Sequence, residues 1–250
     1  VDNRYRGMDD KIHNAIEDNR YTVFSLWDTY RTLHPLLSII DENRSRDFAK
    51  TFIDMQLQNG ELPMWELASA ETHCMIGMHG VSVLAELYQK GLGIYPKLTL
   101  ESMLNNTDPQ LRVMNKRNYT EKKHNLLGLD RFTENGYISS EFEHEGVSKT
   151  VEYAYNMYCV AQVAKSQGRM DVYDEYIRKS QYYKNLINPA TGFIEPKKNG
   201  RFLKNFDLKQ IDQNYTEGNG WHYTFYAPHD IPALINLMGG ELEFCKKLDK

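Results

Sequence analysis

Apolar side chains recur along most of this chain at intervals of three and four residues. Residues 26–40 show the pattern clearly, and the spacing places their apolar side chains on one face of an amphipathic helix. These side chains are Leu26, Tyr30, Leu33, Leu37 and Ile40. Because the same period of about 3.6 residues appears in every long segment, we expect an all-α fold. Any strands should be short and confined to loops.

Similar spacing predicts further helices. One runs through Phe48, Phe52 and Met55 and should end at Asn59-Gly60, because glycine readily adopts the left-handed conformation that closes a helix. Other helices are expected over roughly residues 72–90, 99–117 with a break at Asp108-Pro109, 119–127, 147–168, 173–187, after Asp230 with Pro232 in the first turn, and after Gly240. The segments expected to be loops are 61–71, 130–146 and 190–227.

Length and charge exclude several classes of protein. The 250 residues, 41% of them hydrophobic, are enough for a substantial core. Thirty basic against 34 acidic side chains give a net charge of -4, which argues against a surface for nucleic acid or anionic membrane. No apolar run reaches the roughly 18 residues of a membrane-spanning helix. The first residues also lack the apolar core of a signal peptide.

The three cysteines define no disulfide framework, because Cys74, Cys159 and Cys245 are odd in number and far apart. We expect them to be buried apolar thiols. Cys74 stands near His73 and His79, but this spacing matches no common zinc template and offers only three local donors. We therefore assign no metal ligand within the chain.

A segment near the end of the chain has the composition of a sugar site. Residues 215–224 read Tyr-Thr-Glu-Gly-Asn-Gly-Trp-His-Tyr-Thr and place the carboxylate of Glu217 beside two glycines and several aromatic side chains. The glycines favour a strained loop that aims Glu217 and Trp221 into a cavity. A carboxyl held against aromatic surface stays protonated more readily and can serve as a general acid. The alternative is a turn in which the glutamate caps a helix and the tryptophan fills the core.

Together with two blocks from the first third of the chain, this segment resembles glycoside hydrolase family 92, the calcium-dependent exo-acting α-mannosidases. The two blocks are Ser25-Leu26-Trp27-Asp28-Thr29-Tyr30-Arg31 and Leu62-Pro63-Met64-Trp65-Glu66. Further matches spread over almost the whole chain, at residues 5–9, 71–77, 147–155, 191–193 and 228–240.

The resemblance implies an (α/α)6 toroid built from antiparallel helical hairpins. The apolar spacing supplies fewer helices than such a toroid needs, and the chain ends at Lys250 inside an expected helix with no capping residue after it. We therefore expect residues 1–250 to be a single α-helical domain, an incomplete catalytic domain truncated at its C-terminal side.

The resemblance also implies roles for individual residues. Glu217 matches the general acid of an inverting glycosidase, whose base is expected beyond Lys250. Trp27 and Asp28 match a pair that binds the sugar. Arg31 either contacts the sugar or holds Asp28 by a salt bridge at i, i+3.

Four more residues are candidates for substrate contact. Trp65 and Glu66 resemble another wall of the mannose pocket, although a lone tryptophan is more often a core residue. Trp221 and His222 are expected near the sugar or its leaving group, with core packing as an equal alternative for His222. The three blocks should converge on one concavity, because a pyranose pocket must surround a single ring.

The resemblance implies a calcium cofactor, with ligands expected mainly beyond Lys250. The acidic pairs Asp9-Asp10 and Asp41-Glu42 lack the spacing of a calcium loop. The expected activity is release of terminal α-linked mannose from glycans by a secreted or periplasmic enzyme, and the isolated chain should be inactive. Two alternatives remain, a non-catalytic carbohydrate-binding or scaffold protein and a polysaccharide lyase with a tyrosine or histidine base. Helix faces left uncovered in an incomplete toroid should make the isolated chain self-associate.

Overall fold

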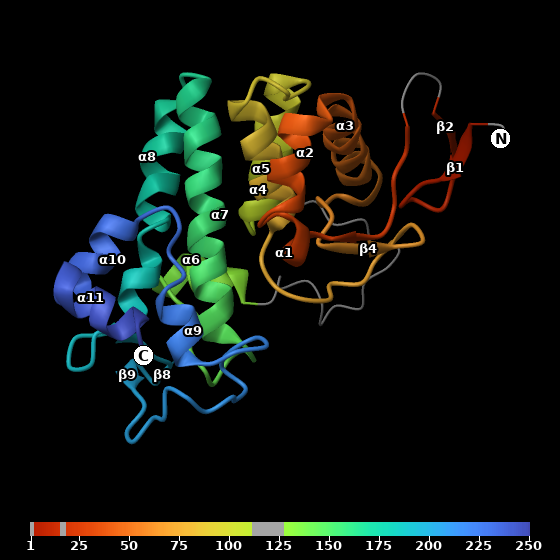
Figure 1. The fold of residues 1–250 in the computed structure, drawn as a ribbon. Helices are drawn as coiled ribbons and strands as arrows, with labels where there is room; N and C mark the ends of the chain where they lie inside the picture. Colours follow the sequence, from red (N-terminus) through yellow and green to blue (C-terminus); the bar gives the residue numbers. More distant parts are fainter. Residues whose placement is uncertain (1–2, 16–18, 112–127) are drawn as a thin grey trace. The chain divides into compact units, whose positions relative to one another are not determined.

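The structure is a computed structural model that describes residues 3–15, 19–111 and 128–250 (Figure 1). This part of the chain is mainly helical, as the apolar spacing predicts. The helices are α1 (Leu26–Thr29), α2 (Leu33–Ile40), α3 (Glu42–Asn59), α4 (His79–Gln89), α5 (Pro96–Thr107), α6 (Leu129–Asn135), α7 (Gly146–Ser166), α8 (Met170–Lys179), the 3-10 helix η2 (Tyr182–Leu186), α9 (Gly220–Thr224), α10 (Ile231–Leu237) and α11 (Glu241–Leu248).

The strands in the described part are short, as expected. They are β1 (Arg4–Arg6), β2 (Ile12–Asn14), β3 (Phe24–Ser25), β4 (Trp65–Leu67), β5 (Ala70–Glu71), β6 (Ile187–Asn188), β7 (Phe193–Ile194), β8 (Lys197–Lys198) and β9 (Arg201–Phe202). All pairings are antiparallel, and β3, β4 and β5 form a sheet in which Ser25 lies opposite Trp65 and Phe24 opposite Glu66.

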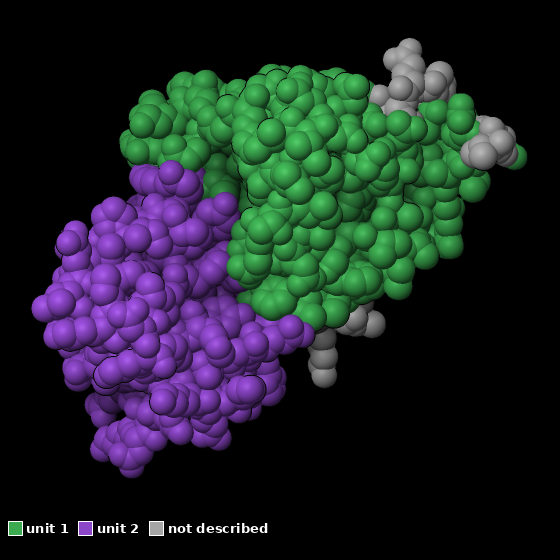
Figure 2. Space-filling view, viewed as in Figure 1, with its two compact units in different colours: residues 1–125, 159–176 green, residues 126–158, 177–250 purple. Residues whose placement is uncertain are grey.

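The chain divides into two compact units (Figure 2). Unit 1 comprises residues 1–125 and 159–176, and unit 2 comprises residues 126–158 and 177–250. In unit 1, helices α2 to α5 pack against one another. Phe52 of α3 is fully buried, and its ring meets Phe24 edge to face at 4.8 Å. The predicted end of α3 is confirmed, since Gly60 takes the left-handed conformation with φ 89°.

The predicted helix over residues 26–40 is wrong in two respects. It divides into α1 and α2, because Pro35 has no N–H to donate to the carbonyl of Arg31 and its ring would clash there. The buried face of α2 carries His34 and Ser38, whereas Leu33 and Ile40 are 44% and 67% exposed. The apolar stripe of α2 therefore faces away from the rest of unit 1.

Contacts within unit 1 explain this reversal. The ring of His34 lies 5.2 Å from that of Phe48 and 6.0 Å from that of Phe52, so α3 packs against the face of α2 that carries His34. The ammonium of Lys90 donates to Ser38 Oγ at 2.6 Å. These contacts turn most of the leucines and isoleucines of α2 outward, and among them only Leu37 is half-buried.

The core of unit 2 is built on α7. Tyr153 is fully buried there, and its ring meets Phe132 of α6 edge to face at 5.7 Å. The predicted α7 is confirmed, whereas all but the first residue of α6 falls in residues 130–146, which were predicted to be a loop. Its first residue, Leu129, and Phe132 are both buried, and this packing stabilises a helix of only seven residues.

Other predicted boundaries shift. The helix predicted over residues 72–90 begins only at His79, and the one over 173–187 divides into α8 and η2. Of the one over 99–117, the part before the predicted break is α5, and residues 112–117 lie outside the described residues. The helix predicted over 119–127 lies outside the described residues. Cys159 is buried as expected, but Cys74 and Cys245 are exposed, the former in an irregular loop and the latter on the surface helix α11. None of the described helices is long and apolar enough to cross a membrane.

Candidate functional site

Glu217 lies on a loop just before α9, in unit 2. Its φ of 47° is left-handed, so the loop holds a residue with a Cβ in an unfavourable backbone conformation. The side chain is exposed, while its neighbours Thr216 and Gly218 are buried. Within residues 3–15, 19–111 and 128–250, the Glu217 carboxylate makes no hydrogen bond and no ion pair. The predicted strained loop is therefore present, and it presents the carboxylate to solvent.

The peptide groups of Thr216 are held on both sides. Its N–H donates to Ser148 Oγ at 2.9 Å, and its carbonyl accepts the hydroxyl of Tyr223 at 2.7 Å. Ser148 is fully buried and Tyr223 is 7% exposed. The residue before Glu217 is thus fixed to α7 at its nitrogen and to α9 at its oxygen.

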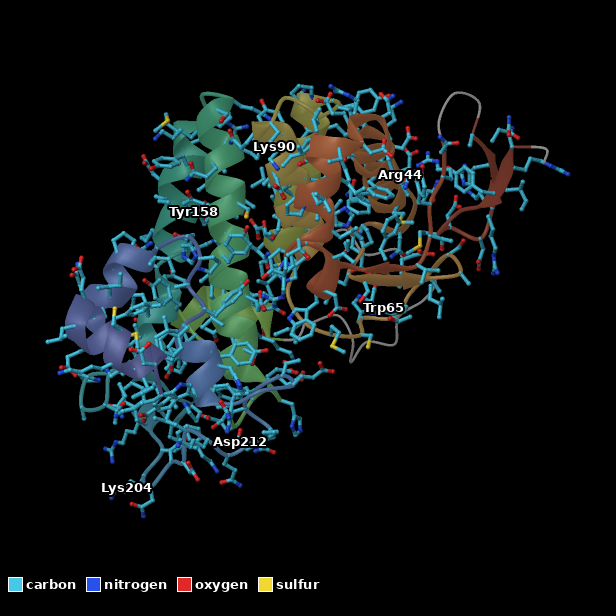
Figure 3. All side chains as sticks on the ribbon, in the orientation of Figure 1. Arg44, Trp65, Lys90, Tyr158, Lys204 and Asp212 are labelled. Atoms are coloured by element: carbon cyan, nitrogen blue, oxygen red, sulfur yellow. The ribbon has the colours of Figure 1, made fainter. Side chains whose placement is uncertain are left out.

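The chain leading into this loop is fixed as well. Glu145 N donates to the carbonyl of Gln213 at 2.6 Å, and Val147 N donates to that of Asn214 at 3.2 Å. The carboxylate of Asp212 accepts the N–H of Asn214 at 2.8 Å, and Asp212 marks this part of the loop in Figure 3. The start of α7 therefore runs beside the approach to Glu217.

Trp221 and His222 follow on α9. The half-buried indole of Trp221 lies 4.9 Å from the ring of Phe193, and His222 is exposed. Asn219 caps α9, since its Oδ1 accepts the N–H of His222 at 3.2 Å. The alternative in which Glu217 caps this helix is therefore wrong.

In unit 1, Trp27 and Asp28 lie at the start of α1. Asp28 is exposed and accepts a short hydrogen bond from the hydroxyl of Ser25. The guanidinium of Arg31 lies over the rings of Trp27 and Tyr30, at 5.1 and 4.8 Å from their centroids, and Arg31 Nε donates to the Trp27 carbonyl. Of the two alternatives for Arg31, the salt bridge to Asp28 is wrong for the described residues, and the guanidinium lies over aromatic rings.

The sheet of β3 and β4 brings two of the predicted blocks together. Trp65, labelled in Figure 3, is half-buried on β4 opposite Ser25, the residue that bonds Asp28. Leu26 N donates to the carbonyl of Met64 at 3.2 Å. Trp65 therefore lies in the same part of unit 1 as Asp28. Convergence of this region with Glu217 in unit 2 stays a prediction.

Glu66 is almost completely buried, at 1% exposure. Its carboxylate accepts the Thr22 hydroxyl at 2.8 and 2.9 Å, Val23 N at 2.8 Å and Ser69 N at 2.6 Å. Val23 is left-handed, with φ 65°. Glu66 thus clamps an unfavourable corner just before β3, a structural role that the resemblance does not suggest. Its contact with substrate stays a prediction.

Three polar residues near Trp65 were not singled out from the sequence as site candidates: Glu61 is buried, and Glu71 and His73 are half-buried. Glu71 accepts the N–H groups of Met64, Trp65 and His73 at 2.8 to 2.9 Å, and burial raises the pKa of its carboxyl. The imidazole of His73 pairs with Glu61 at 3.0 Å. The only signal for this cluster was the family-like block at residues 71–77, since nothing local announces the burial of a carboxylate.

His229 and Asp230 lie near the start of α10. Asp230 occupies the N-cap position as predicted, but its carboxylate makes no capping bond. It accepts instead from the hydroxyl of Tyr183 and the ammonium of Lys184, both at 3.0 Å, which lower its pKa against the opposing effect of burial. His229 Nε2 lies 2.9 Å from the Ser180 carbonyl, and burial lowers the pKa of its ring.

The described residues do not supply a calcium cage. Among them, no group of three or more histidine, cysteine, aspartate or glutamate side chains is arranged to hold a metal ion. Calcium takes about six to eight oxygen ligands, and no such cluster of acidic side chains is present in this part of the chain. The donor set in hand therefore does not fit a calcium ion.

Comparison with known proteins is consistent along the chain. The family model for the glycosyl hydrolase family 92 catalytic domain matches residues 1–250. The family GH92 α-mannosidase BT3965 from Bacteroides thetaiotaomicron is 36% identical, with a TM-score of 0.87, over 100% of this chain and 32% of that one. The inverting mannosidase BT2199 from Bacteroides thetaiotaomicron VPI-5482 is 30% identical, with a TM-score of 0.87, over 98% of this chain and 32% of that one.

A curated relative is more distant in coverage. An uncharacterized secreted glycosidase of Arthroderma benhamiae is 30% identical over 138 residues, which are 45% of this chain and 18% of that protein. The chain thus spans about a third of the solved relatives it matches, and less of the fungal one. With the family model matched from end to end, the chain belongs to glycoside hydrolase family 92.

Proposed function

We propose that the protein containing this chain removes terminal α-linked mannose from glycans with inversion of configuration, and that Glu217 is its general acid. The geometry of the Glu217 loop carries this proposal. An exposed carboxylate that has no partner among the described residues, on a loop fixed on both sides, is arranged to meet a ligand. The names of the solved relatives, an α-mannosidase and an inverting mannosidase, supply the substrate and the stereochemistry.

In this proposal the chain is part of an (α/α)6 toroid. Glu217 donates a proton to the leaving oxygen, while a second carboxylate about 6.5 to 9.5 Å away activates water on the other face of the sugar. That base lies outside this chain. Asp28 accepts hydrogen bonds from sugar hydroxyls, and Trp27 and Trp65 offer apolar faces to its C–H surface.

We further propose that calcium takes its ligands mainly from other parts of the polypeptide. When bound, it would hold two sugar hydroxyls and help to distort the ring. The donor set of the described residues does not fit the ion by itself. Secretion or a periplasmic location is proposed from the resemblance and from the secreted fungal relative.

The first test is Glu217→Gln in the full-length protein. The amide keeps the shape of the side chain but cannot donate the proton, so turnover of a natural mannoside should fall by about 10² to 10⁴ with binding nearly unchanged. An activated aryl mannoside, whose leaving group needs no protonation, should lose much less. Glu241→Gln, at an exposed position of α11, is the matched control and should leave both rates unchanged. Equal losses on the two substrates would remove Glu217 from the acid role.

Self-association of the isolated chain stays a prediction, and α2 offers the surface for it. Leu36, Ile39 and Ile40 are 52%, 72% and 67% exposed. Exposed apolar side chains clustered in this way favour association. Ile39→Lys should reduce the apparent mass of the isolated chain in analytical ultracentrifugation. An unchanged mass would exclude this face.

A further inference from the structure

We propose that Tyr223 and Ser148 are positioning residues for Glu217, acting through the peptide groups of Thr216. The inference rests on the proposed function, because it concerns the orientation of the proposed acid. Neither side chain needs to touch the substrate.

The backbone at Glu217 is in an unfavourable conformation. A residue with a Cβ is unfavourable at φ 47° and persists there only when its surroundings impose the conformation. The Thr216 carbonyl belongs to the peptide unit that continues directly into Glu217 N, so a bond to that oxygen sets the plane from which Glu217 starts. Tyr223 OH makes this bond at 2.7 Å.

Ser148 restrains the other side of Thr216. Its Oγ accepts Thr216 N–H at 2.9 Å, and it lies in the first turn of the 21-residue helix α7. Together the two hydroxyls prevent rotation of the chain on either side of Thr216. Both bonds are buried, so water does not compete for them.

Gly218 makes the arrangement possible. A Cβ at this position would lie 3.2 Å from Cε2 of Tyr223 and 3.4 Å from Nδ1 of His222. The absence of a side chain therefore lets the Tyr223 ring lie close beneath the loop. The glycine after Glu217 thus serves approach of the ring, whereas Glu217 itself carries the left-handed turn.

Tyr215 supplies a matched control within the same unit. Its hydroxyl donates to the carbonyl of Ile194 at 2.9 Å, and the residue is 3% exposed. Tyr215→Phe and Tyr223→Phe each remove one buried hydroxyl-to-carbonyl bond. Only the second frees the carbonyl next to Glu217.

The experiment compares wild type, Tyr223→Phe, Ser148→Ala and Tyr215→Phe in the full-length protein. Misplacement of a catalytic group by about 1 Å costs up to about 10²-fold in rate. We expect Tyr223→Phe and Ser148→Ala to lower kcat for a natural mannoside by roughly 10- to 100-fold with KM little changed. The loss for an activated aryl mannoside should be within about threefold, since that substrate does not depend on the acid.

Two outcomes overturn the inference. One is an equal loss for Tyr223→Phe and Tyr215→Phe, which would mean that only general stability was affected. The other is an equal loss on natural and activated substrates, which would mean that Glu217 was not the group displaced.

Amide hydrogen exchange separates this inference from the proposed function. The Thr216 amide should exchange faster in Ser148→Ala and Tyr223→Phe than in wild type, and should keep its wild-type rate in Tyr215→Phe. If exchange follows this pattern while Glu217→Gln remains fully active, Ser148 and Tyr223 do form a clamp on Thr216, but Glu217 is not the acid. Wild-type exchange in all variants would overturn the clamp itself.

Discussion

Both units hold non-glycine residues in the left-handed conformation near predicted sugar contacts, and one such residue in each unit is restrained by different chemistry. In unit 1 the residue is Val23, φ 65°, and the buried carboxylate of Glu66 holds it. In unit 2 the residue is Glu217, φ 47°, and the hydroxyls of Ser148 and Tyr223 hold its neighbour. One clamp is charged and the other is neutral.

The difference follows from what each loop presents. Hydrogen bonds to a carboxylate are stronger than those between neutral groups, which suits a corner whose purpose is to fix β3 and the start of α1. A second charge beside a general acid would bias the protonation of that acid. Neutral hydroxyls hold a loop without this effect, so they suit the loop that carries Glu217.

The largest expected effect comes from removing the charged clamp. Glu66→Ala leaves the N–H groups of Val23 and Ser69 without their acceptor, and each bond to a charged group contributes about 1.5 to 3 kcal/mol. We expect the free energy of unfolding to fall by about 3 to 5 kcal/mol in denaturant titration. Glu66→Gln, which keeps one acceptor oxygen, should lose about half as much. Glu101→Ala, an exposed control on α5, should change the free energy of unfolding by less than about 0.5 kcal/mol. A change equally small for Glu66→Ala would refute the clamp.

The next largest effect is expected on acidification, which should lower the stability of unit 1. Burial lowers the pKa of His34 from 6.5 to about 4, so the folded state keeps the ring neutral while the unfolded chain binds a proton. The stability from this neutral burial is complete above pH 6.5 and is lost as the pH falls toward 4, by about 3 kcal/mol. His34→Leu should flatten this part of the pH profile of unfolding. His144→Leu, at an exposed position, should leave the profile unchanged. Equal pH profiles for wild type and His34→Leu would contradict the prediction.

Burial also lowers the pKa of His229 in unit 2. The same sign applies there, since a depressed histidine pKa means stability that is lost on acidification. The His34→Leu variant should therefore still lose some stability in acid, because His229 remains. The double variant His34→Leu/His229→Leu should lose less. Hydrogen exchange at pH 5 would assign the components to the two units.

The smallest effect should come from relieving backbone strain. Val23→Gly removes the Cβ that disfavours φ 65°, and because Val23 is 53% exposed little packing is lost. The left-handed penalty of about 1 to 2 kcal/mol exceeds the entropic cost of glycine, about 0.5 to 1 kcal/mol. A gain of about 0.5 to 1 kcal/mol is expected. Val23→Ala keeps a Cβ and should gain nothing.

The same change at Glu217 tests whether the loop in unit 2 is strained in the same way. Glu217→Gly should raise stability by a similar small amount, because this side chain is exposed at φ 47°. It should also abolish the proposed acid. A loss of stability would show that the Glu217 side chain supports its loop.

Several local features follow from the amino-acid sequence alone. Apolar spacing gave α3, α7 and α11 their places, and glycine chemistry gave α3 its end at Gly60. A strained loop around Glu217 was predicted from its glycines, but the left-handed residue there is Glu217 itself and neither Gly218 nor Gly220. The family blocks pointed to Trp27, Asp28 and Trp65, and β3 and β4 bring these segments together in unit 1.

Tertiary contacts, in contrast, set which face of α2 packs inward and which distant residues form hydrogen bonds. The apolar stripe of α2 faces outward because α3 packs against His34, which no period within α2 could reveal. The clamp at Val23 requires Glu66, 43 positions away, and the clamp at Thr216 requires Ser148, 68 positions away. Burial and hydrogen-bond partners at such separations are set by packing of the whole unit, so they are absent from the local pattern of the chain.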